Sequence, residues 1–179
     1  TCLHELGHLL LDKNRDHYCD IPDAPKEPDV TFYPYNALID AIINYKLSIN
    51  INIPRFYNLF LVNRLNFIRE NKNRLHDINT RPHKVLGDYC YNYTFWKYIL
   101  RNEDKEQNNL VNLYLERFKY KICDHFNLND NNFRDFEKSL DNFQKIKDSN
   151  DLNQIYCFIL RVYYVLNSWG KIQFWDKET

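Results

Sequence analysis

The segment HELGH, residues 4–8, combines residue types that bind and use a metal ion. In a helix, residues four apart lie on the same face, so His4 and His8 direct their imidazoles at one place. Neutral imidazole is a preferred zinc ligand, and a glutamate after the first histidine can act on a metal-bound water. The motif therefore predicts a zinc site with His4 and His8 as ligands and Glu5 as general base.

Apolar residues surround this motif. Leu3, Leu6 and residues 9–11 predict that the helix is buried, and Gly7 predicts that another backbone approaches it closely. Burying two histidines and a glutamate is costly unless a partner satisfies them. We expect a metal ion to be that partner; the alternative is a structural helix whose histidines are only hydrogen-bonded.

A second segment supplies a candidate for the third zinc ligand that a catalytic site requires. Asn36, Asp40 and Asn44 form one polar line along a helix that is otherwise apolar. A buried carboxylate on such a helix needs a cation or hydrogen-bond donors. We predict Asp40 as the third ligand, with the two asparagines as its hydrogen-bonding neighbours. The alternative is a polar stripe that faces solvent.

Glu27 is the second candidate for the third ligand. Eighteen residues separate it from His8, a spacing similar to that in gluzincins of the aminopeptidase type. It lies in a proline-rich loop, however, whereas the gluzincin ligand is carried by a helix. The metzincin continuation is excluded, because its glycine and third histidine are replaced by Leu11 and Asn14.

Hydrophobic residues recur at spacings of three and four in nearly every segment, so we predict a mainly α protein. The first helix is expected to end near residue 12 and to be followed by a loop at 12–29. Further helices are expected at 35–48, 54–71, 91–101, 108–126, 132–147 and 152–169, with a linker at 76–88. We interpret residues 1–75 as a partial zincin-like core and 76–179 as a helical extension that could belong to the same domain.

Charge and cysteine content exclude several classes of function. The 24 Lys and Arg residues balance 24 Asp and Glu residues and are spread along the chain, so nucleic acid is not an expected partner. The five cysteines are odd in number and include no C-x-x-C pair, which favours a reducing, cytoplasmic setting. The longest apolar stretch, 155–166, contains Arg161 and is too short to span a membrane, so no membrane partner is expected.

HELGHLLL, followed after a loop by YNALIDAIIN, resembles a family of metallopeptidases found beside von Willebrand A-like domains. In that family an H-E-x-x-H helix precedes a helix reading approximately N-x-x-x-D-x-x-x-N. The resemblance covers about the first fifty residues. It implies zinc as cofactor, a polypeptide substrate, His4, His8 and Asp40 as ligands, and Glu5 as general base. HELGHLLL is also similar to the helix of ImmA/IrrE-type peptidases, but their E-x-x-A-N-x-F-A helix is absent here.

The expected reaction is hydrolysis of a peptide bond by a zinc-activated water. Glu5 would take the water's proton during the attack and pass it to the leaving amine. A further group must stabilise the oxyanion. The candidates lie in loops or at helix starts, and nothing in the sequence chooses among them: Tyr33, Tyr35, His76 and His83.

Zincins carry an edge strand before the H-E-x-x-H helix, and this strand binds the substrate backbone. Only three residues precede His4, and the chain contains no methionine. We therefore expect a fragment of a longer protein, with the N-terminal sheet missing from this chain. The alternative function is a helical interaction or regulatory module that retains the metal site without catalysis and contacts a protein partner through helices in 76–179.

Overall fold

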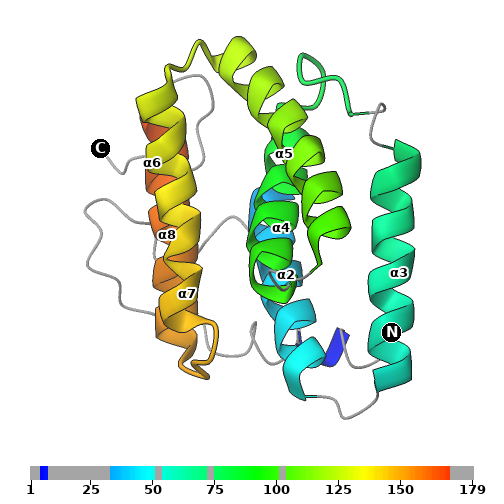
Figure 1. The fold of residues 1–179 in the computed structure, drawn as a ribbon. Helices are drawn as coiled ribbons and strands as arrows, with labels where there is room; N and C mark the ends of the chain where they lie inside the picture. Colours follow the sequence, from blue (N-terminus) through cyan, green and yellow to red (C-terminus); the bar gives the residue numbers. More distant parts are fainter. Residues whose placement is uncertain (1–4, 8–32, 51–53, 72–74, 101–103, 170–179) are drawn as a thin grey trace.

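The computed structural model describes residues 5–7, 33–50, 54–71, 75–100 and 104–169 (Figure 1). Across these ranges the chain is mainly helical and contains no strand, which confirms the prediction of a mainly α protein. The longer segments form α2 (Tyr33–Asn50), α3 (Pro54–Asn71), α4 (Pro82–Ile99), α5 (Lys105–Phe126), α6 (Asp130–Asp141), α7 (Phe143–Ile146) and α8 (Leu152–Ser168).

The ends of these helices follow from local chemistry. Pro54 and Pro82 open α3 and α4, where a missing amide hydrogen costs no helical hydrogen bond. The side chains of Asn129 and Asp151 each accept a hydrogen bond of 2.9 Å from a backbone amide in the first turn of α6 and α8. Asn127, with φ of 54°, ends α5 in the left-handed conformation.

The expected helix bounds agree with the structure for most of the chain, and α3 has the expected bounds. The linker expected at 76–88 is wrong in its second half, because α4 already begins at Pro82. The first turns of α4 bury one face against the core, through the side chains of Val85, Leu86 and Tyr89. The helix expected at 132–147 is interrupted at Asn142, which separates α6 from α7.

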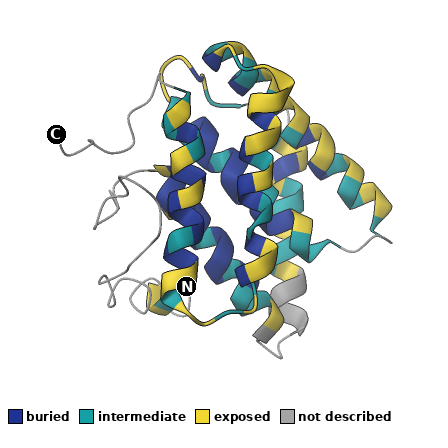
Figure 2. Cartoon of the chain, turned by 90° about the vertical axis from the view of Figure 1, so that its left-hand side faces the viewer, coloured by how far each residue is buried: buried dark blue, intermediate teal, exposed yellow. Residues whose placement is uncertain are grey.

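The helices pack around the pair formed by α2 and α4 (Figure 1). On one side α5 packs against α4, and α3 packs against α5; on the other side α6 and α7 pack against α8, and α6 also contacts α4. The buried faces of these helices point towards one another and the exposed faces point outwards (Figure 2). No described helix is long and apolar enough to cross a membrane.

Gly87 lets α2 and α4 approach each other closely. A Cβ atom at this position would lie 2.4 Å from Cδ1 of Tyr33 and 3.2 Å from the backbone oxygen of the same residue. A larger residue would therefore have to displace the Tyr33 ring and shift the nearby backbone of α2 by a few tenths of an ångström. Gly87 therefore allows the close approach between α4 and the first turn of α2.

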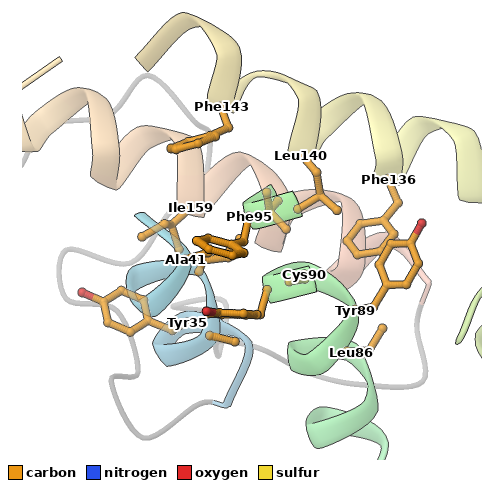
Figure 3. Packing of buried hydrophobic residues seen from close by; sticks show 14 of the residues in the cluster. Tyr35, Ala41, Leu86, Tyr89, Cys90, Phe95, Phe136, Leu140, Phe143 and Ile159 are labelled. Atoms are coloured by element: carbon orange, nitrogen blue, oxygen red, sulfur yellow. The ribbon is translucent and has the colours of Figure 1, made fainter. Parts of the chain in front are cut away.

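Aromatic side chains fill the core between the helices (Figure 3). The ring of Tyr89 on α4 packs edge-on against Phe133 and is tilted over Phe136, with centroids 5.3 and 5.7 Å away. Its hydroxyl donates a hydrogen bond of 2.8 Å to Oε1 of Glu137. Because α2 contributes to the same core, residues before and after position 75 are packed together.

Candidate functional site

The described part of the HELGH motif, Glu5 to Gly7, is helical and lies against α2. A Cβ atom on Gly7 would lie 2.9 Å from Cγ2 of Ile43 and 3.2 Å from its Cδ1. The expected close approach at Gly7 is therefore observed, although the approaching group is a side chain rather than a backbone. The two predicted zinc ligands of this motif, His4 and His8, lie outside the described residues.

The expectation that the motif helix is buried is wrong for Leu6, whose side chain is 49% exposed. Gly7 faces α2, and the neighbouring residue of a helix is rotated by about 100°, so Leu6 lies on the side of the motif helix rather than towards α2. Glu5 is exposed as well. The carboxylate predicted to act as general base is therefore open to solvent.

The polar line predicted on α2 is present, and its surroundings are apolar as expected. Asn36 is exposed, whereas Asp40 and Asn44 are half-buried. The Asn44 amide nitrogen donates a hydrogen bond of 3.0 Å to the hydroxyl of Tyr91 on α4. The other side chains of this stretch of α2 are buried: Ala37, Leu38, Ile39, Ala41, Ile42, Ile43 and Tyr45.

Asp40 lines a pocket of about 320 Å³ between α2, α3, α4 and α5, which we call the α2–α5 pocket. The charged side chains and the imidazole in its lining come from three helices and one loop. Asp40 belongs to α2, Arg64 to α3, Lys84 and Asp88 to α4, and His76 to the segment before α4. The pocket therefore brings together two carboxylates, two permanent cations and an imidazole.

Burial and charge set the proton affinities of this pocket. Burial raises the pKa of Asp88 to about 6, although the cations of Lys84 and Arg64 act in the opposite direction. Burial also lowers the pKa of His76, and the nearby charges of Lys84 and Arg81 lower it further. Near pH 7 we therefore expect His76 to be neutral and Asp88 to be largely ionised.

The structure also separates the four residues proposed to stabilise an oxyanion. Tyr33 and His76 line the α2–α5 pocket together with Asp40. Tyr35 is only 8% exposed and belongs to the hydrophobic core. His83 lies on α4 and is half-buried, and it does not line this pocket. Tyr33 and His76 are therefore the two candidates that share a site with Asp40.

The described residues by themselves do not form a metal centre. Within them, no group of three or more His, Cys, Asp and Glu side chains is arranged to hold a metal ion. Glu27, the alternative third ligand, lies outside the described residues. The half-buried carboxylate of Asp40 has the donor chemistry of a zinc ligand, and Ile43, which contacts Gly7, lies on the next turn of the same helix.

Sequence reasoning did not identify Arg64, Lys84 and Asp88 as site residues. Lys84 and Asp88 are four residues apart on α4, a spacing that puts both on one helical face. This spacing indicates a shared face only if the stretch is a helix, whereas the sequence predicts a linker there. Arg64 carried no signal of its own, since an arginine on a helix surface is common.

Gly7→Ala is expected to lower the free energy of unfolding by about 1 kcal/mol. Overpacking against Ile43 costs about 1–3 kcal/mol, and the better helix propensity of alanine returns about 1 kcal/mol. In an Ile43→Ala background the same change should be neutral or stabilising, because the Cγ2 atom that it meets is gone. Urea unfolding of the four proteins measures this coupling, and an equal cost in both backgrounds would contradict the contact.

Asp88→Asn is expected to stabilise the protein increasingly as the pH rises. The pKa of Asp88 is about 6 in the folded state, whereas the ordinary pKa of an aspartate is 3.8. Between these two pH values the folded state therefore binds more protons than the unfolded state. The free energy of unfolding of the wild type therefore falls by about 2 kcal/mol between pH 4 and pH 7, as Asp88 ionises. The asparagine variant does not ionise, so its free energy of unfolding does not fall for this reason. Urea unfolding at both pH values measures the difference, with Asp124→Asn on the exposed surface of α5 as the control. A difference between Asp88→Asn and wild type that does not change with pH would contradict the raised pKa.

Comparison of the chain with protein family models, with curated proteins and with solved structures found no match. The geometry around α2 and the α2–α5 pocket is therefore the basis for assigning a function.

Proposed function

We propose that this protein is a zinc-dependent peptidase whose site is formed by the HELGH motif and α2. The contact between Gly7 and Ile43 carries the proposal. It joins the described turn of the motif to the helix on which Asp40 lies, three residues before Ile43. His4, His8 and Asp40 would hold the metal in this proposal.

The neighbourhood of Asp40 supports a role as a metal ligand. Burial and the Asp40 carboxylate both raise the pKa of Tyr91, while the Arg64 guanidinium and the Asn44 hydrogen bond act in the opposite direction. Asp40 is therefore close enough to influence a hydroxyl that Asn44 already holds. This is the kind of hydrogen-bonded surrounding that orients a ligand carboxylate.

In the proposed mechanism, His4, His8 and Asp40 would hold a zinc ion, which when bound would supply a Lewis acid and make a water molecule more acidic. Glu5, which is exposed, accepts the proton of the attacking water and delivers it to the amine nitrogen of the leaving product. Neutral His76 or the hydroxyl of Tyr33 donates a hydrogen bond to the oxyanion from the α2–α5 pocket.

The proposal is tested by metal analysis and by a cleavage assay on the full-length encoded protein. Purified protein should contain about one zinc ion per chain. It should cleave members of a mixed peptide library, lose this activity with a chelator and regain it with added zinc. Absence of zinc would overturn the proposal. Bound zinc without cleavage of any peptide would favour the helical interaction module instead.

A further inference from the structure

The α2–α5 pocket has the size and lining of a small-molecule site. Its volume of about 320 Å³ lies at the lower end of the range for ligand pockets, about 300–1,000 Å³. Apolar side chains from α2, α3 and the segment before α4 contribute to its wall, among them Ala37, Phe67 and Leu75. Charged groups from α2, α3 and α4 complete it.

Two cations of this pocket are held by aromatic rings. The Cζ atom of Arg64 lies 4.6 Å from the ring centroid of Tyr91, and the Nζ atom of Lys84 lies 5.0 Å from that of Tyr33. In the part of the chain that the structure describes, neither cation forms an ion pair with a carboxylate. Both cations therefore retain the capacity to pair with an anionic group of a ligand.

The carboxylates in the same lining restrict which anion fits. Asp88 and Asp40 would both repel a doubly charged phosphate, because like charges in a buried site oppose each other strongly. A singly charged carboxylate reduces this cost, particularly when the ligand also carries a hydrogen-bond donor or a positive charge. Asp88 can then accept a hydrogen bond from that donor.

We infer that the α2–α5 pocket binds an α-amino carboxylate, either as a free amino acid or as the C-terminal residue of a short peptide. The ligand carboxylate pairs with Arg64 and Lys84. The ammonium group or amide N–H of the ligand donates a hydrogen bond to the carboxylate of Asp88. Its side chain packs against the apolar wall. This inference does not depend on the zinc site, because none of these three residues belongs to the HELGH motif or to the polar line of α2.

Calorimetric titration of the full chain, in buffer with a chelator, tests the inference. The probes are free amino acids, the matching Ala-X dipeptides, the amides of both, and inorganic phosphate. At least one free amino acid or one dipeptide should bind, and its amide should bind at least about tenfold more weakly because it lacks the charge. Binding of the free series only, or of the dipeptide series only, identifies the source of the carboxylate. Failure of both series, equal binding of the amides, or competition by phosphate at equal affinity would overturn the inference.

Matched variants locate the binding in this pocket. Arg64→Gln and Lys84→Gln should each weaken binding at least about tenfold. Arg69→Gln should not, since Arg69 lies on the same helix but is exposed and donates a hydrogen bond to Asn66. Circular dichroism checks that each variant folds; if Arg64→Gln does not, Lys84→Gln decides. Wild-type affinity in the folded variants would overturn the inference, whatever the zinc content or peptidase activity of the protein.

Discussion

Replacing Glu5 by glutamine is expected to lower peptide hydrolysis by about 10²–10⁴-fold, the usual contribution of a general base, while the zinc content stays unchanged. Glutamine keeps the size and polarity of the side chain but does not accept a proton at neutral pH. The exposure of Glu5 makes the folding cost of this change small. The effect should therefore appear in kcat rather than in the amount of folded protein.

The measurement compares hydrolysis rates and zinc content of the full-length protein and two variants. Glu70→Gln is the matched control, because Glu70 is an exposed glutamate at the end of α3. It should leave both quantities unchanged. Hydrolysis at the wild-type rate in Glu5→Gln would rule out Glu5 as the base. Loss of zinc in that variant would mean that the carboxylate supports the metal rather than the proton transfer.

The helices were predictable because each one buries a face whose spacing is visible in the sequence. In α2, the apolar residues around Asp40 occupy every direction except the polar line, and the structure buries them. The same reasoning missed the first turns of α4. Pro82, Gly87 and the charges around them look like loop residues, yet Pro82 opens a helix and Gly87 makes room for Tyr33. Such a role depends on a neighbouring helix that is distant in sequence.

The sequence predicted only those residues of the candidate site that lie within a single helix or a single motif. Asp40 was found because its neighbours at four-residue spacing are also polar. Arg64 on α3 and Asp88 on α4 line the same pocket. The hydrophobic periodicity of one helix does not indicate which other helix packs against it, so this pairing was not predictable. The raised pKa of Asp88 likewise follows from burial by several helices at once.

Asp40→Ala is expected to weaken zinc binding by more than about 100-fold, whereas Glu27→Ala should leave it unchanged. Loss of a residue that only orients a ligand already costs about 10–100-fold, so loss of a ligand should exceed this range. The matched control is Asp88→Asn, because Asp88 lines the same pocket but is not on the polar line of α2. Its zinc affinity should equal that of the wild type.

Zinc affinity is measured by competition with a chromophoric chelator on protein whose folding has been checked without metal. This check matters because Asp40 lies beside Tyr91 and Asn44, so its removal can also loosen the contact between α2 and α4. Asn44→Ala isolates that effect, since it removes the Tyr91 hydrogen bond and keeps the carboxylate. If only Asp40→Ala loses zinc, the carboxylate itself is the ligand. If Glu27→Ala loses zinc and Asp40→Ala keeps it, the third ligand is Glu27. Asp40 is then a lining residue of the α2–α5 pocket and not a zinc ligand.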